Sequence, residues 1–207
     1  MYIPHANKVE DHAPLFDLMR QFSFATLVSA PDGIPVATHL PFMVRPDAGP
    51  NGMLLGHMAR ANTQWRSFDP VREVLTIFLG DHAYISPSWY LEHPSVPTWN
   101  YVVVHAYGLP RIVDDEDAVR RMLRELVQQH ESGFQTPWPM DLPPAYESMM
   151  IKGIVAFEIT LTRLEGKFKL SQNRSLPDRA GVISALGDSG GVGKLMSKLE
   201  QTPAQLP

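Results

Sequence analysis

The segment from residue 81 to residue 108 concentrates side chains that could enclose a flat ligand. It contains two of the four tryptophans of the chain, together with four tyrosines and three histidines. Ser86, Ser88, Thr98 and Asn100 lie among these rings. A pocket for a flat heteroaromatic molecule needs apolar walls and a few placed polar groups, so the composition favours such a pocket. Packing in the core or in a dimer interface is the alternative use of the same rings.

A second set of candidate residues lies in GHMARANTQW, residues 56–65. This stretch places Arg60, Asn62 and Gln64 where an expected strand turns into an expected short helix. Amides at a helix N-terminus beside an arginine favour an anion, most often phosphate. The competing interpretation makes Arg60 a solvated surface charge and Asn62 a helix cap.

A third set lies in KFKLSQNR, at the end of the last expected strand. Two lysines, an arginine and two side-chain amides occupy these eight residues, 167–174. Charge this concentrated is usually a solvated face. The amides and the serine also allow recognition of a phosphate or of a ring edge, and both interpretations stay open.

The histidines give a weaker signal. His39, His57, His82 and His105 could assemble a metal site only from distant strands, and no His-Glu-x-x-His motif is present. Core or surface histidine is the favoured interpretation, so no metal site is predicted. His39 lies in THLPF, and a strand that contains a proline lies at an edge or a bulge of its sheet. The backbone there would be partly free to meet a ligand.

The elements that position these residues follow from hydrophobic periodicity and turn signals. We expect strands at 23–30, 36–44, 53–58, 73–80, 100–113 and 153–170, the last possibly broken at Gly166, and helices at 11–22, 59–68 and 114–131. Strands do not alternate with helices, which disfavours a doubly wound parallel sheet. The sequence therefore predicts a mainly β fold with flanking helices (α+β), a small closed or split antiparallel β-barrel.

The chain divides into an expected barrel domain, 1–174, and an expected helical tail, 175–207. Residues 187–193, GDSGGVG, indicate mobility between two short helices of the tail. The final GVGK lacks the spacing and the preceding strand of a phosphate-binding P-loop.

Composition sets further bounds. With 207 residues, 44% hydrophobic and 19% charged, the chain is typical of a globular protein. The absence of cysteine excludes disulfides, thiolate nucleophiles and iron–sulfur clusters. A net charge of -4 gives no general attraction to nucleic acid or to an anionic membrane. No apolar run predicts a membrane span, and we expect a cytoplasmic protein.

Six motifs together carry a family resemblance. MYIP, HLPF, GHMARAN followed by QW, YISPSWY, VPTWNY and KLSQNR resemble the PaiB-type FMN-binding negative transcriptional regulators. The resemblance covers nearly the whole chain in order and is poorest beyond about residue 185. That family in turn resembles the split barrels of flavin reductases and pyridoxamine-phosphate oxidases, which are homodimers that hold FMN at the subunit interface.

The resemblance implies a set of cofactor contacts. The strand that carries His39, Leu40 and Pro41 would face the flavin ring. Arg60 and Asn62 would bind the phosphate of FMN.

Further contacts are implied in the later part of the chain. Asn100 would offer an amide to the flavin, with Trp99 or Tyr101 nearest the ring. The C-terminal basic segment would reach the cofactor from the partner subunit through Lys169, Gln172 and Arg174. His57 completes the candidate contacts and, like His39, is a candidate proton relay.

Three functions stay open. The first is a flavin-binding homodimer that represses transcription and senses redox state. The second is an FMN-dependent oxidoreductase that uses NAD(P)H or a small substrate, in which the flavin performs the chemistry. The third is a dimeric scaffold with a vestigial pocket. DNA is a weakly supported partner, because the net charge is negative and no helix-turn-helix pair is evident.

Overall fold

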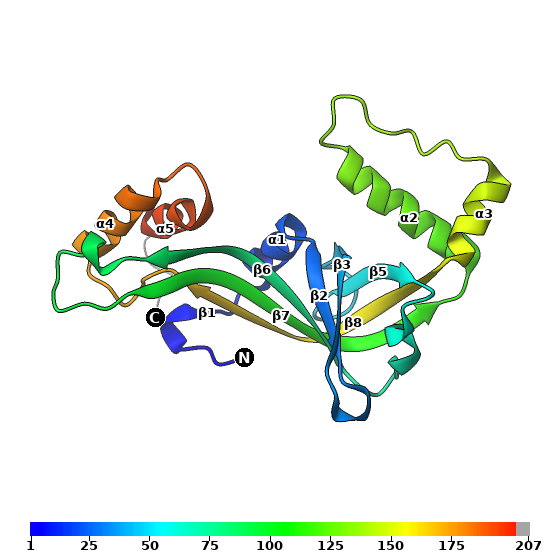
Figure 1. Cartoon of the computed structure of the whole chain (residues 1–207), viewed down its shortest axis with the longest axis horizontal. Coiled ribbons are helices and arrows are strands. Elements are labelled where there is room, and N and C mark those ends of the chain that lie inside the picture. The colour runs from blue at the N-terminus through cyan, green and yellow to red at the C-terminus, as the bar shows by residue number, and fades with distance from the viewer. Residues whose placement is uncertain (202–207) are drawn as a thin grey trace. The chain divides into compact units, whose positions relative to one another are not determined.

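The computed structural model describes residues 1–201. Its strands form one antiparallel sheet in the order β3-β2-β6-β7-β8-β5-β4, with β1 paired to β8 (Figure 1). The strands are β1 (Lys8–Val9), β2 (Phe24–Ser29), β3 (Val36–Pro41), β4 (Met43–Arg45), β5 (Met53–Ala59), β6 (Val74–Ile85), β7 (Thr98–Val113) and β8 (Ile154–Lys169). The predicted mainly β fold with flanking helices is confirmed.

The α-helices are α1 (His12–Gln21), α2 (Glu116–Glu131), α3 (Pro144–Lys152), α4 (Leu176–Leu186) and α5 (Gly191–Gln201). The four 3-10 helices are η1 (His5–Asn7), η2 (Pro31–Gly33), η3 (Thr63–Ser67) and η4 (Pro87–Trp89). Within the described part of the chain, every helix is too short or too polar to cross a membrane.

Most predicted elements are confirmed. The strand expected at 36–44 is divided into β3 and β4, and the short β1 was not predicted. β6 continues to Ile85 rather than ending at residue 80. The helix expected at 59–68 is only the short η3, because Asn62 caps it from outside. The helix α3 was not predicted at all, since its sequence begins in a proline-rich stretch. Its Pro144 occupies the first turn, where a proline loses no helical hydrogen bond.

Two compact units divide the chain, and each is described by itself. Unit 1 consists of Met1–Leu18, Leu79–Val104 and the chain from Glu165 onward, and unit 2 consists of Met19–Phe78 and His105–Leu164. Both units therefore include parts of β6, β7 and β8. The predicted domain boundary at residue 174 stays a prediction.

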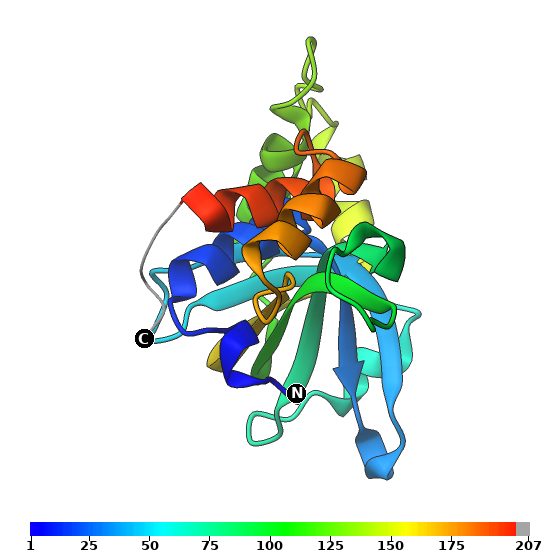
Figure 2. The same cartoon turned by 90° about the vertical axis from the view of Figure 1, so that its left-hand side faces the viewer.

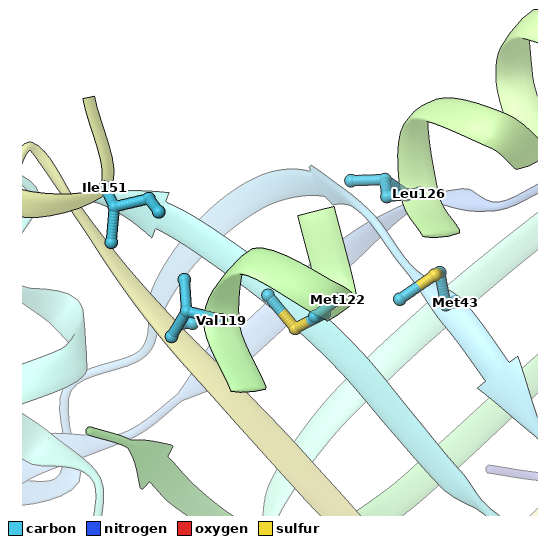
Figure 3. Close-up of a cluster of buried hydrophobic side chains, with 6 residues drawn as sticks. Met43, Val119, Met122, Leu126 and Ile151 are labelled. Atoms are coloured by element: carbon cyan, nitrogen blue, oxygen red, sulfur yellow. The ribbon is translucent and has the colours of Figure 1, made fainter. Parts of the chain in front are cut away.

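Unit 2 has its core between strands and helices. Phe42 lies 6.0 Å from Phe78 and 6.1 Å from Phe157, measured between ring centroids, and all three are fully buried. A second cluster joins α2 and α3 to the sheet (Figure 3), and its members are Met43, Val119, Met122, Leu126, Ile151 and Ala156. Burial of each large apolar side chain contributes about 1.5–3 kcal/mol, so the amphipathic face of α2 holds that helix in place.

Unit 1 is closed by the last two helices, which lie side by side (Figure 2). Val182 of α4 and Val192 and Met196 of α5 are buried. Gly166 does not break β8. A Cβ atom at this position would lie 2.2 Å from Leu15 of α1, so the glycine lets the helix approach the strand.

Candidate functional site

The twelve predicted contact residues fall equally in the two units. Unit 1 contains Trp99, Asn100, Tyr101, Lys169, Gln172 and Arg174, and unit 2 contains His39, Leu40, Pro41, His57, Arg60 and Asn62. We describe the two groups separately.

Lys169 and Trp99 meet on the surface of unit 1. The Lys169 ammonium donates to the carbonyl oxygen of Trp99 at 2.5 Å and also to the hydroxyl of Thr98. The Trp99 side chain is 53% exposed. Burial and the neighbouring charge of Lys167 lower the pKa of Lys169. A cation is thus fixed to the backbone of a residue whose own side chain faces solvent.

Lys167 adds a second cation to the same strand. Its ammonium donates to the carbonyl oxygen of Tyr2 at 3.2 Å and lies 5.5 Å and 5.2 Å from the ring centroids of Tyr2 and Tyr101. The residue is 8% exposed. Among residues 1–201, no carboxylate lies within ion-pair distance of Lys167 or Lys169. Aromatic faces stabilise a lysine by about 0.5–2 kcal/mol but do not neutralise its charge.

Two further rings extend the aromatic surface. Tyr84 meets Trp99 edge to face with centroids 5.9 Å apart, and His82 lies 6.3 Å from Trp99. Tyr84 is 48% exposed. Contiguous exposed aromatic side chains mark binding surfaces more often than single ones do. We call Tyr84, Trp99, Tyr101, Lys167 and Lys169 the cationic aromatic face.

Asn100 lies away from this face. It is fully buried, and its amide nitrogen donates to Ser171 at 2.9 Å, with the sulfur of Met196 at 3.5 Å. Its side-chain oxygen is buried without a hydrogen-bond partner. In this structure Asn100 therefore joins β7 to the start of the C-terminal segment and to α5.

Gln172 and Arg174 also bind within unit 1. Gln172 closes on its own segment, accepting from the Leu170 amide at 2.7 Å and donating to the Phe168 carbonyl at 2.5 Å. The Arg174 guanidinium stacks on Tyr90 at 4.1 Å and lies 3.7 Å from the carboxylate of Asp178. These contacts support a structural role for both side chains.

Arg60 in unit 2 ties a helix end to a strand. Its guanidinium donates to the carbonyl oxygens of Lys152 at 2.7 Å and Ile154 at 2.6 Å. Its backbone amide donates to the Gly153 carbonyl at 2.9 Å. Carbonyls at a helix C-terminus lack intrahelical partners, and Arg60 supplies donors to the end of α3.

Asn62 is the N-terminal cap of η3, which was the alternative to the predicted phosphate contact. Its side chain accepts from the Gln64 amide at 3.0 Å and donates to the Thr38 hydroxyl at 2.9 Å. Gln64 is 4% exposed, and its amide nitrogen donates to the Leu27 and Val36 carbonyls. These contacts fix η3 against β2 and β3.

The histidines of unit 2 differ in exposure. His39 is exposed, bonds Thr26 at 3.0 Å and stacks on Phe24 with centroids 6.5 Å apart. Leu40 is buried beside it, and Pro41 ends β3. Burial lowers the pKa of His57, whose Nδ1 has no hydrogen-bond partner. No cluster of metal-ligating side chains occurs within residues 1–201.

Two members of the cationic aromatic face were not among the predicted contacts. Lys167 stands two residues before Lys169 on a strand, and side chains two apart point to the same side. That spacing could have identified it. Tyr84 required knowledge that β6 continues past residue 80, which the apolar pattern did not reveal.

Comparison with known proteins gives the family. A family model described as "Putative FMN-binding domain" matches residues 1–163. The chain is 38% identical over 190 residues to the Bacillus subtilis protein named Protease synthase and sporulation protein PAI 2, covering 90% of this chain and 89% of that protein. It is 35% identical over 190 residues to an uncharacterized protein of Emericella nidulans, covering 74% and 76%. These matches confirm the resemblance carried by the six motifs.

Solved structures support the fold. The FAD and heme binding protein from Mycobacterium smegmatis superposes with a TM-score of 0.62 at 15% identity, covering 87% of this chain and 80% of that one. The flavocytochrome Anf3 from Azotobacter vinelandii gives 0.59 at 13% identity, covering 78% and 68%. At such identities the likeness concerns the fold alone, and it confirms the predicted split barrel.

Proposed function

Because the chain belongs to the FMN-binding domain family, we propose that it is a homodimeric flavoprotein that represses transcription in response to the redox state of its FMN. FMN is the cofactor that family membership gives, and when bound it supplies reversible electron transfer. The observation that carries the proposal is the pair of lysines, Lys167 and Lys169. Lys167 lies against the ring of Tyr101 and Lys169 against the backbone of Trp99, with no carboxylate at ion-pair distance among the described residues.

The donor set fits an anionic ring cofactor. A lysine ammonium has three N–H groups, and Lys169 uses two of them on Trp99 and Thr98. Both acceptors belong to β7, so the ammonium is held on a rigid strand. The third N–H is left for a ligand acceptor. Lys167, which donates to the Tyr2 carbonyl, adds positive charge next to it.

The aromatic members suit the flat part of FMN. Trp99 and Tyr84 offer exposed ring surface, and Tyr101 lies against the Lys167 ammonium. We assign Trp99, Tyr101 and Lys169 as direct cofactor contacts, as the resemblance implied, and add Lys167 and Tyr84. Asn100, which bonds Ser171, is a positioning residue for the segment that follows Lys169.

The contacts of unit 2 form a second part of the proposal. His39 and Phe24 present an exposed pair of rings at the edge of β3. Pro41 donates no hydrogen bond, which leaves acceptors at this edge. His39, Leu40 and Pro41 stay candidate contacts for the flavin. Arg60 and Asn62 use their side chains inside the protein and are assigned structural roles.

The regulatory role is supported by similarity. The 38% identical relative is named for protease synthase and sporulation. The net charge of -4 disfavours tight direct binding to DNA. Repression would therefore use a salt-sensitive contact or a protein partner.

Flavin binding is tested by titrating the protein with FMN and following flavin fluorescence. Lys169→Gln should weaken binding about tenfold, because a hydrogen bond to a charged group contributes about 1.5–3 kcal/mol. Lys194→Gln is the matched control, since Lys194 is an exposed lysine of α5 in the same unit. Equal affinities of the two variants would remove the cationic aromatic face from the site.

Dimerisation and repression need separate measurements. Light scattering with and without FMN should give twice the monomer mass. A promoter reporter should be derepressed by Lys169→Gln and Trp99→Leu but not by Lys194→Gln. A monomeric, FMN-loaded protein would contradict the homodimer. Repression that is unchanged in variants with weak FMN binding would contradict flavin-dependent repression.

An oxidoreductase is the second candidate. It is favoured by His82, whose ring lies 6.3 Å from Trp99 and could exchange a proton near the ligand face. FMN-dependent NAD(P)H oxidation that is lost in His82→Gln, with FMN affinity retained, would support this activity. If the FMN-loaded protein does not oxidise NAD(P)H, the transcriptional regulator remains as the proposed function.

A further inference from the structure

Unit 2 contains a cavity that the flavin proposal does not use. Its volume is about 200 Å³, and its walls come from the ends of β5 and β7, the first turn of α2, the end of α3 and the start of β8. We infer that this cavity binds a small zwitterion with an apolar side chain, an aliphatic α-amino acid. The inference is independent of flavin binding.

The floor of the cavity is apolar. Val119 of α2 and Ile151 of α3 line it together with Val155 and Ala156 of β8. All four side chains are at least 91% buried. Such a floor has no hydrogen-bonding side chain for a polar group of a ligand, so it suits a branched aliphatic chain.

The rim of the cavity carries charges of both signs. Asp114 and Lys152 line it, and neither forms an ion pair or side-chain hydrogen bond within residues 1–201. Asp114 follows β7 directly, and Lys152 ends α3. A carboxylate and an ammonium at one rim match the ammonium and the carboxylate of an amino acid.

Arg60 adds a fixed donor to the rim. Its Nε and Nη2 bond the carbonyl oxygens of Lys152 and Ile154, which immobilises the guanidinium. A guanidinium has five N–H groups, so the two on Nη1 are free for a carboxylate. Arg60 and Lys152 would then bind the ligand carboxylate together.

Neither the size nor the charge of the cavity suits FMN. Sites for larger organic ligands occupy about 300–1,000 Å³, more than this cavity offers. Asp114 and Glu116 line it together with Arg60 and Lys152, so the lining charges balance and give no net attraction to a phosphate dianion. A molecule with one positive and one negative group matches both signs.

The inference is tested by calorimetric titration of the full-length protein with L-leucine, in the presence and absence of FMN. Three probes each lack one feature: 4-methylpentanoate has no ammonium, 3-methylbutylamine has no carboxylate and glycine has no aliphatic chain. L-leucine should bind at least about tenfold more tightly than each, because each lost group leaves a charge or the apolar floor unmatched.

Variants of the rim complete the test. Lys152→Met and Asp114→Asn should each weaken L-leucine binding about tenfold, and FMN affinity should not change. Arg121→Met, an exposed change on α2 that also removes one positive charge, is the control and should bind normally. Equal binding of L-leucine and the three probes, or no heat and no thermal stabilisation with L-leucine up to about 10 mM, would overturn the inference.

Discussion

The Lys169 ammonium lies 2.5 Å from the carbonyl oxygen of Trp99, across a sequence separation of 70 residues. The contact fixes the end of β8 to the start of β7. The same indole is half exposed, so the contact presents a cation and a ring together. This relationship makes the pH dependence of cofactor binding a test of the site.

FMN affinity should fall with rising pH earlier than an ordinary lysine would allow. Burial and the charge of Lys167 lower the pKa of Lys169 below the ordinary lysine value of 10.5, so its positive charge is lost at a lower pH. Lys167→Gln removes one cause and should shift the fall to higher pH. Fluorescence titrations across a pH series measure it, with Lys169→Gln as the variant that lacks this transition.

The same pKa shift affects stability with the opposite sign. The unfolded chain holds the Lys169 proton more tightly than the folded chain does. The free energy of unfolding should therefore rise as pH increases through the lowered pKa towards the unfolded value.

The pH midpoint of FMN release tests the assignment of Lys169 as a cofactor contact. A midpoint that Lys167→Gln leaves unchanged, or moves to lower pH, would contradict that assignment.

Gly193→Ala should destabilise unit 1 although alanine favours helices. In an exposed helix the change would stabilise by about 1 kcal/mol. A Cβ at this position would lie 1.8 Å from the carbonyl oxygen of Gly187, which is backbone and cannot turn aside. We expect a net loss of about 1–3 kcal/mol, measured by urea unfolding.

Gly190→Ala is the matched control for this change. No atom lies within 4 Å of a Cβ added there. It should alter the unfolding free energy by less than about 0.5 kcal/mol. Equal behaviour of the two variants would show that α5 does not pack on the end of α4 as described.

The glycines also show where sequence patterns stop being informative. Residues 187–193 predicted mobility, because a run of glycines has few anchoring side chains. Gly191 instead begins α5, and Gly193 allows a close backbone contact. Gly166 predicted a break in a strand and permits the approach of Leu15. A single sequence gives the conformational freedom of glycine but not the neighbour that requires it.

Periodic segments were predictable for the opposite reason. The apolar spacing of residues 114–131 identified α2, and its buried Val119, Met122 and Leu126 were recognised from that spacing alone. The helix α3 has no clear amphipathic pattern, and one of the contacts that fix it is the bond from Arg120 to Glu147 at 3.0 Å. A contact across 27 residues leaves no local signal.

The candidate site divides in the same way. Aromatic clustering indicated Trp99 and Tyr101 as ligand contacts, which stays a prediction. It could not tell which neighbours point inward, and Asn100 is buried against Ser171. For Arg60 the residue type indicated a hydrogen-bond donor. Its acceptors are carbonyl oxygens at the end of α3, which the sequence did not predict, and at the start of β8.

Asp178→Ala should be among the more damaging single changes in unit 1. The carboxylate is fully buried and accepts from the amides of Leu91 and Glu92 at 2.8 and 3.1 Å. Removing it leaves the two backbone amides without this acceptor and Arg174 without its carboxylate partner. We expect a loss of about 2–4 kcal/mol, seen as a lower urea midpoint at an unchanged slope.

Asp178→Asn separates the two contributions. The amide oxygen can still accept from both backbone amides, whereas the ionic attraction to Arg174 at 3.7 Å is lost. Its destabilisation should be less than half that of Asp178→Ala. Asp188→Ala, an exposed change, should have no measurable effect. A harmless Asp178→Ala would mean that the carboxylate does not anchor the 91–92 segment.

Arg60→Gln should reduce stability rather than cofactor binding. The change removes donors from the Lys152 and Ile154 carbonyls at the end of α3, and water can replace them only in part. A loss of about 1–2 kcal/mol is expected. Arg60→Lys retains the charge but not the planar fork, so it should recover less than half. Urea unfolding and FMN titration on the same samples distinguish the two roles. A large fall in FMN affinity at unchanged stability would return Arg60 to the phosphate site.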